Sequence, residues 1–150
     1  MKKSCIWIAF SYAIAGLIGG VFYREFTKVF TYVDRNTLGF LHVHLLVMGM
    51  IMFLVISLFN EKLHLDRTKL WKPFLIVYNI GLPFTVSMLI VRGVMQVIGY
   101  DGGAVVSGIA GVAHIILGAG IILFFIMLLL TVGKGSKKRG SFENNETNVL

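Results

Sequence analysis

Residues 38–59 read LGFLHVHLLVMGMIMFLVISLF, and this stretch decides the class of fold. It contains no Lys, Arg, Asp or Glu. A helix rises about 1.5 Å per residue, so a stretch of this length crosses the hydrocarbon core of a bilayer, which is about 30 Å thick. The stretch therefore predicts a membrane-spanning helix.

Three further apolar blocks accompany this stretch. They are Cys5–Tyr23, Phe74–Gly99 and Ala104–Val132. The whole chain of 150 residues is 57% hydrophobic and only 14% charged, whereas soluble domains carry about 25% charged residues. This composition excludes an ordinary soluble enzyme and a disordered chain, and the single cysteine excludes a disulfide scaffold. We expect an all-α integral membrane four-helix bundle.

The domain organisation follows from the position of the last apolar block. Residues 1–133 form the expected four-span domain, and residues 134–150, rich in Lys, Gly, Ser, Asn and Glu, form an expected disordered cytoplasmic tail. The turn at residues 100–103 joins the last two spans as an antiparallel hairpin. The start of the chain resembles a signal peptide, but its apolar run continues through Phe22, so we expect a retained first span.

Basic residues lie before the first span, between the second and third, and after the fourth. They are Lys2, Lys3, Lys62, Arg67, Lys69, Lys72, Lys134, Lys137, Lys138 and Arg139. The first loop also has Arg24, Lys28 and Arg35, partly balanced by Glu25 and Asp34. Because cytoplasmic segments are enriched in Lys and Arg, both termini are expected inside, in a bacterial plasma membrane. The net charge of +7 is thus a topology signal. It forms no basic–aromatic stripe, so no nucleic acid partner is expected.

Ionisable residues inside a span are costly and are functional candidates by default. His42 and His44 lie in the second span, Arg92 lies in the third and His114 lies in the fourth. We interpret His64, in the charged loop, as solvated.

The two histidines of the second span point in different directions. On a helix with 3.6 residues per turn, His42 and His44 are about 200° apart. They cannot easily share one metal ion, but they can bind two cofactors on opposite faces. Met48 follows His44 on its own face, and Gly49, seven residues after His42, leaves room for something flat and bulky.

In the fourth span, His114 lies on a stripe with Ser107, Gly111 and Gly118. Small residues around a histidine indicate either a close helix contact or a slot for a planar ring. Both interpretations stay open at this point.

Arg92 is the candidate for binding carboxylates. Counted from the outer span ends, Arg92 and His44 lie about 10 Å deep and His114 about 15 Å deep. An arginine can hold a carboxylate through two parallel hydrogen bonds, as haem propionates would require. Gln96 lies one turn from Arg92 and is included in this candidate site.

The stretch LHVHLLVMG at residues 41–49 resembles the tenth helix of the haem–copper oxidase catalytic subunit. In that family an H-x-H pair followed by Met-Gly binds two haems on opposite helix faces. The resemblance implies that His44 binds a low-spin haem and His42 a high-spin haem, with Arg92 similar in placement to the arginines that hold the propionates. The whole chain also looks like a small uncharacterised family of four-helix bacterial membrane proteins.

The oxidase subunit has twelve helices in three arcs of four, so this chain looks like one arc. The resemblance therefore implies a homotrimer that rebuilds the ring, with haems between subunits. The chain has no two-histidine copper motif, no histidine–tyrosine pair and no recognisable proton channel. Oxygen reduction and proton pumping are therefore not expected.

The sequence favours a haem-b-binding membrane protein that transfers electrons or binds O2 or NO. His42, His44 and His114 are the candidate iron ligands; the redox partner and any catalysis stay open. One alternative is a carrier of copper or another soft metal that uses histidines and methionines. Another is a structural partner subunit without a cofactor, whose histidines form hydrogen bonds between helices.

Overall fold

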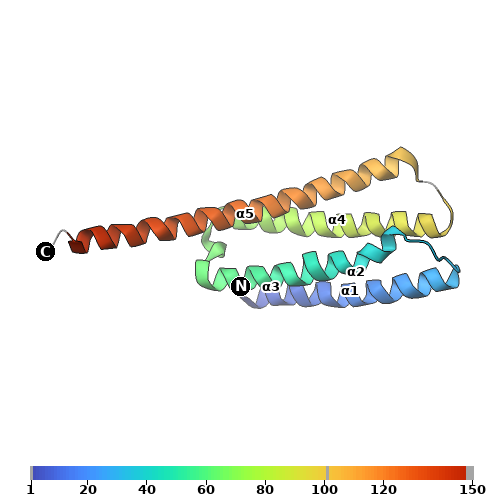
Figure 1. The fold of residues 1–150 in the computed structure, drawn as a ribbon, viewed down its shortest axis with the longest axis horizontal. Coiled ribbons are helices and arrows are strands. Elements are labelled where there is room, and N and C mark those ends of the chain that lie inside the picture. Colours follow the sequence, from blue (N-terminus) through green and yellow to red (C-terminus); the bar gives the residue numbers. More distant parts are fainter. Residues whose placement is uncertain (1, 101, 148–150) are drawn as a thin grey trace.

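The structure, a computed structural model, describes residues 2–100 and 102–147, with the side chains of residues 3–100 and 102–133. The described elements are helices (Figure 1). In chain order they are α1 (Lys2–Val29), η1 (Thr37–Phe40), α2 (Leu41–Val43), η2 (His44–Ile51), α3 (Met52–Leu63), η3 (Leu65–Arg67), α4 (Trp71–Val97) and α5 (Gly103–Thr147).

Within the described residues, four helical segments are long and apolar enough to cross a membrane. They are Lys3–Val29, Thr37–Leu63, Trp71–Val97 and Gly103–Gly133. The second of them is a composite of η1, α2, η2 and α3, which follow one another without a break. The four predicted spans are confirmed, and the chain is a multi-pass membrane protein by the length and composition of its helices.

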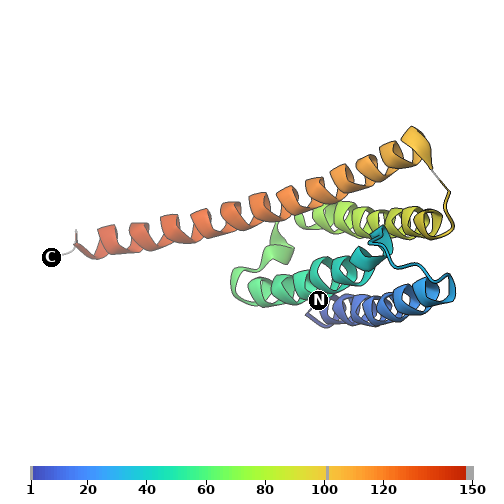
Figure 2. The ribbon, with the colours of Figure 1, turned by 45° about the vertical axis from the view of Figure 1, so that its right-hand side comes forward.

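The spans pack mainly against their neighbours in the sequence. α1 packs on η2 and α3, η1 packs on α4, and α4 makes its most extensive contact with α5. Figures 1 and 2 show α1 and α5 on opposite sides of the molecule, with the second span and α4 between them. α4 is the most buried of the four spans.

We call the half of the molecule that holds the start of α1, the end of α3 and the start of α4 the basal half, and the other half the apical half. The basal half contains an aromatic core to which all four spans contribute. The ring of Phe74 lies 5.5 Å from Tyr78 and 5.7 Å from Phe124, and Phe53 lies 5.8 Å from Tyr78, as measured between centroids. Burial of these large rings holds the spans together.

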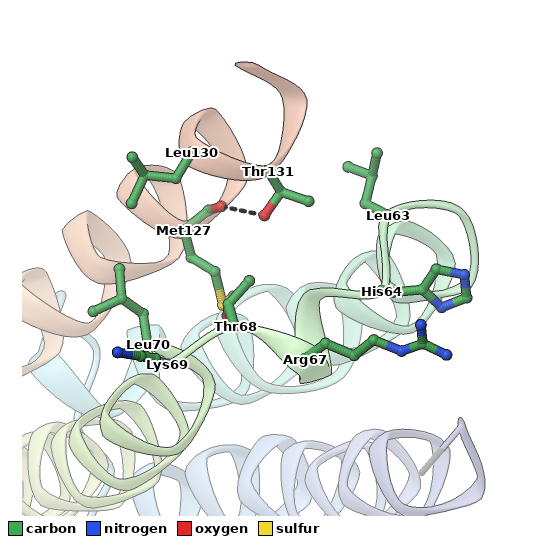
Figure 3. Close-up of a pocket in the computed structure, with 9 residues that line it drawn as sticks. All are labelled: Leu63, His64, Arg67, Thr68, Lys69, Leu70, Met127, Leu130 and Thr131. Atoms are coloured by element: carbon green, nitrogen blue, oxygen red, sulfur yellow. Dashed lines mark hydrogen bonds between the residues drawn. The ribbon is translucent and has the colours of Figure 1, made fainter. Parts of the chain in front are cut away.

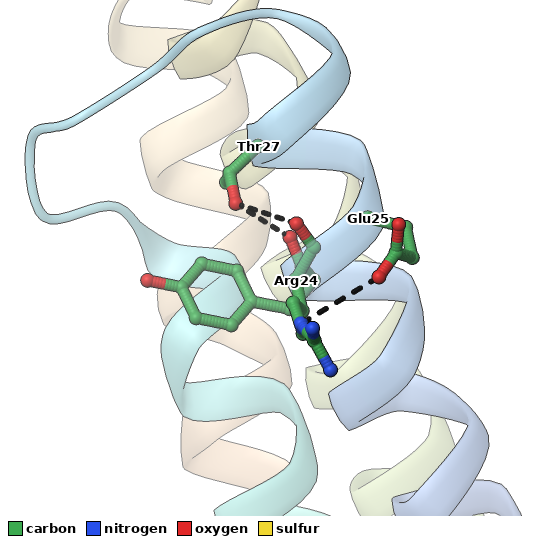
Figure 4. A network of polar contacts seen from close by, with 4 residues as sticks. Arg24, Glu25 and Thr27 are labelled. Carbon is green, nitrogen blue, oxygen red and sulfur yellow. Dashed lines mark hydrogen bonds and ion pairs between the residues drawn. The ribbon is translucent and has the colours of Figure 1, made fainter.

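The apical end of α1 carries a small polar network (Figure 4). Arg24 Nε lies 3.6 Å from a carboxylate oxygen of Glu25, and the Thr27 hydroxyl donates to the Tyr23 carbonyl at 2.8 Å. The one cation of this network is thus accompanied by a carboxylate. Two residues after α1 ends, Thr31 takes a positive φ of 51° as the chain reverses.

The connection from α4 to α5 has glycines at two positions where the backbone is left-handed. Gly99 and Gly103 have positive φ angles of 72° and 61°, which glycine adopts without the penalty that a Cβ brings. This agrees with the turn expected at residues 100–103, of which Asp101 lies outside the described residues.

The fourth helix extends beyond its apolar segment, and the disorder expected from residue 134 stays a prediction. α5 continues to Thr147, although its membrane-length apolar segment ends at Gly133. The segment from residue 134, expected as a disordered tail, contains no proline. Nothing in it therefore removes the backbone N–H groups that a helix needs.

Candidate metal and cofactor site

The second span is not a regular α-helix where it carries its histidines. His44 is the first residue of η2, an eight-residue π-helix that follows the three-residue α2. π-Helical turns are rare and occur frequently at functional sites. The regular periodicity assumed for the sequence therefore does not apply beyond His44.

Two tyrosines from neighbouring spans support this π-helix. The Tyr78 hydroxyl donates a 2.7 Å hydrogen bond to the Met48 carbonyl. On the other side the Tyr12 ring covers Gly49, and a Cβ at Gly49 would lie only 2.5 Å from the Tyr12 Cγ. The expectation that Gly49 leaves room for a flat group is therefore wrong, because Tyr12 fills that space.

The structure brings His44 of η2 and His114 of α5 together. Their ring centroids are 6.3 Å apart, and the ring planes are nearly perpendicular, at 85°. His44 is half-buried and His114 is exposed, so the pair lies at the margin of the packed helices. The sequence predicts each histidine as a ligand, but it does not pair them.

Hydrogen bonds fix the protonation pattern of both rings. His44 Nδ1 lies 2.9 Å from the Phe40 carbonyl oxygen, and His114 Nδ1 lies 2.8 Å from that of Ala110. A carbonyl oxygen only accepts, so Nδ1 must carry the proton, and in the neutral ring Nε2 keeps a free lone pair. Histidines that bind metals use this arrangement, with one ring nitrogen on a carbonyl and the other on the ion.

The spacing of the rings also suits one shared ion. Because bonds from a metal to imidazole nitrogen are about 2 Å long, two histidines on opposite sides of one ion have ring centroids about 6 Å apart. The observed separation of 6.3 Å matches this value. The pair is therefore a candidate two-ligand metal site.

His42 lies elsewhere. It packs beside Gly20 of α1, where a Cβ on the glycine would lie 3.6 Å from His42 Cβ, while His44 lies beside His114 of α5. The prediction that His42 and His44 lie on different sides of the second span is confirmed. The buried His42 Nδ1 has no hydrogen-bond partner among the described residues.

The three span histidines do not form a single centre. Across residues 3–100 and 102–133, no group of three or more His, Cys, Asp or Glu side chains is arranged to hold a metal ion. A compact three-ligand copper site built from these residue types is therefore absent from that part of the chain.

The glycine stripe around His114 is open. A Cβ added at Gly108, Gly111 or Gly118 would meet no atom within 4 Å. Gly111 and Gly118 lie about one turn to either side of His114. Of the two interpretations given to this stripe, a close contact with another helix of the chain does not occur at these glycines, and the space is available for a ring.

Arg92 lies apical to the histidine pair. Gly81 of α4 lies against Leu117 of α5 in antiparallel packing, which places His114 level with Phe84. Arg92 is eight residues further along α4, about 12 Å at the rise of a helix. It is half-buried and lines a small cavity of about 80 Å³ between α4 and α5.

Two further predicted site residues have structural contacts. The Gln96 side-chain oxygen accepts a 2.8 Å hydrogen bond from the backbone N–H of Thr37, at the start of η1. It therefore attaches the second span to α4, although it also lines the Arg92 cavity. Met48 packs against the aromatic core. Tyr12 was not recognised from the sequence, because an aromatic residue in a span gives no signal of its partner. The hydroxyl of Tyr78 was expected to need a partner within the protein, and its hydrogen bond to Met48 agrees with this.

The helices and the histidine pair define a multi-pass helical membrane protein with a candidate metal or cofactor site. The chain belongs to the family described as a protein of unknown function, DUF2871, whose model matches residues 1–131. The match includes both histidines of the pair and nearly all of the four apolar segments. No curated protein and no solved structure matches the chain.

Proposed function

We propose that this protein binds haem b in the membrane, with His44 and His114 as the two axial ligands of one iron. The observation that carries the proposal is the pair itself: two imidazoles 6.3 Å apart, each with Nδ1 on a carbonyl and with no hydrogen bond to Nε2 from the described residues. Neutral imidazole is a common axial ligand of haem iron.

The surroundings of the pair fit a large planar group. The open surface at Gly111 and Gly118 offers space beside His114 that a larger residue would occupy. Arg92, on the apical side, would hold the propionate groups, because a guanidinium binds carboxylates through two parallel hydrogen bonds. Gly49 and Met48 take no part in this site, since both pack within the protein.

The proposed function is electron transfer. When bound, the haem would supply a one-electron couple. Two histidines on one iron leave no open position, so this arrangement favours electron transfer over binding of O2 or NO. The protein would fix the two rings, limit access of water and set the local charge through Arg92.

The proposal keeps part of the resemblance to one arc of the haem–copper oxidase subunit. Because His44 and His114 belong to one chain, this haem site does not need a second subunit. The homotrimer, the bacterial plasma membrane and the orientation with both termini inside are separate proposals. Cross-linking or mass measurement of the purified protein tests the trimer. Thiol labelling of Cys5→Ser/Val33→Cys from either side tests the orientation, because Val33 is exposed whereas Cys5 is buried.

The test is the optical and magnetic spectrum of the purified full-length protein. We expect a Soret band that shifts on reduction, and a low-spin ferric EPR signal of the strongly anisotropic type that perpendicular axial imidazoles give. His44→Ala and His114→Ala should each abolish the low-spin signal. The matched controls His42→Ala and His64→Ala should keep it.

His114 is exposed, so its replacement should leave the packing intact. Addition of free imidazole to His114→Gly should restore the low-spin signal, which distinguishes ligand loss from misfolding. A protein without a Soret band after supply of haem, or with full low-spin haem in both His44→Ala and His114→Ala, would overturn the proposal. Binding of copper alone would support the soft-metal alternative instead.

A further inference from the structure

A cavity at the basal end lies far from the histidine pair. It has a volume of about 520 Å³, within the range of ligand pockets in proteins. Figure 3 shows it between the connection from α3 to α4 and the last apolar turns of α5. Nothing in the proposed haem function uses this cavity.

The cavity lies at the boundary between apolar spans and polar loops. The second span ends at Leu63 and the third begins at Trp71, while the apolar part of α5 ends at Gly133. Accordingly its walls are of two kinds. Leu63, Leu70, Met127 and Leu130 form the apolar part, and His64, Arg67 and Lys69 form the basic part.

The two hydroxyls of the cavity already have partners. Thr68 Oγ1 donates to the Leu65 carbonyl at 2.7 Å, and Thr131 Oγ1 donates to the Met127 carbonyl at 2.8 Å. The side-chain donors left for a ligand are therefore those of His64, Arg67 and Lys69.

Arg67 and Lys69 are both exposed and extend to opposite sides of Thr68 (Figure 3). Neither forms an ion pair with another residue of the described part of the chain, whereas Arg24 at the apical end lies beside Glu25. The basal cations therefore keep their charge available to an anion.

We propose that this cavity binds an anionic phospholipid. Arg67 and Lys69, from opposite sides of Thr68, would attract the anionic phosphate of the headgroup, and the leucines and Met127 would contact the upper part of an acyl chain. Basic pockets at the cytoplasmic ends of spans bind anionic headgroups in this way. A free phosphate would leave the apolar wall uncovered, so the lipid is the occupant that satisfies both walls.

The experiment compares phosphatidylglycerol with phosphatidylcholine on the delipidated full-length protein, by native mass spectrometry. The test variant is Arg67→Gln/Lys69→Gln. The matched control is Lys62→Gln/Lys72→Gln, which removes the same charge at the same end from residues that do not line this cavity. We expect phosphatidylglycerol to bind the test variant about 30-fold more weakly than the wild type, and the control variant as tightly as the wild type.

Two further arms separate the sources of the anion. Leu130→Trp should fill the apolar part and weaken lipid binding while both cations stay in place; Leu130 is exposed, so this change should not disturb the core. Inorganic phosphate in excess should not displace the lipid. Equal loss in both double variants, unchanged binding in Leu130→Trp, or displacement by phosphate would each overturn the proposal.

Discussion

Glycines at the contact between α4 and α5 and glycines on the open face of α5 have opposite surroundings. In the basal half, a Cβ at Gly81 would lie 2.8 Å from the Leu117 backbone, and one at Gly120 would lie 3.0 Å from the Tyr78 ring. On another face of α5, Gly111 and Gly118 face open space. The same residue type therefore permits close packing on one face of this helix and leaves unfilled space on another.

The burial of side chains also differs between the aromatic core and the candidate site. The basal half buries Phe53, Phe74 and Tyr78 completely. The candidate site instead presents a half-buried and an exposed histidine whose Nε2 atoms are uncommitted. The comparison indicates that the aromatic core of the basal half supplies stability and that the open face of α5, with the histidine pair, is available for chemistry.

The largest expected effect is the loss of stability when the aromatic core of the basal half is disrupted. Phe74→Ala removes a fully buried ring and should lower the free energy of unfolding by about 3–5 kcal/mol. Thermal unfolding in detergent measures the loss. The matched control is Phe125→Ala on the exposed face of α5, where 55% of the residue's surface is accessible, and its effect should be much smaller. Similar losses in both variants would show that the core is not where stability resides.

The next effect tests the glycine contrast directly. Gly81→Ala places a methyl group against backbone atoms that cannot move aside, and it should cost about 1–3 kcal/mol. Gly111→Ala meets no neighbour and should not destabilise the fold. The two unfolding curves, measured side by side, check the contrast, which fails if the two alanines are equally tolerated.

A smaller effect concerns the support of the π-helix. Tyr78→Phe removes the hydrogen bond to the Met48 carbonyl and should cost about 0.5–1.5 kcal/mol. Tyr100→Phe, at an exposed position, is the control. Because Met48 lies one turn beyond His44, we also expect the low-spin EPR signal to broaden in Tyr78→Phe and not in Tyr100→Phe.

The substitution with the smallest expected effect on stability should have the clearest effect on the site. Gly111→Leu fills open space and should change the free energy of unfolding by no more than about 0.5 kcal/mol. In the proposed function it should nevertheless lower the haem content, measured as the ratio of Soret to protein absorbance. Unchanged haem content would indicate that the ring does not lie over this glycine.

The spans could be predicted because hydropathy and length determine them. The block at residues 38–59 became the segment Thr37–Leu63, and the block at 104–132 became Gly103–Gly133. The placement of His42 and His44 on different sides was also predictable, because residues two positions apart in a helix do not lie on the same face.

The wide turn after His44 and the partner of each histidine could not be predicted. They depend on contacts between spans: Tyr78 on Met48, Tyr12 on Gly49, and α5 beside η2 at His114. A single sequence carries the local preferences of each helix, but it does not state which faces meet. For the same reason the sequence suggests Gln96 as a site residue, although its side chain accepts a hydrogen bond from Thr37.

The wide turns of η2 make the direction of His44 depend on chain length as well as on residue identity. Loss of one residue between positions 44 and 51 would let the segment close into ordinary turns at little cost in hydropathy. It would also rotate the imidazole by about 100° about the axis of the rod, away from its partner on α5. Among relatives, a one-residue gap at this place would thus mark proteins that retain the histidine but have lost the pairing.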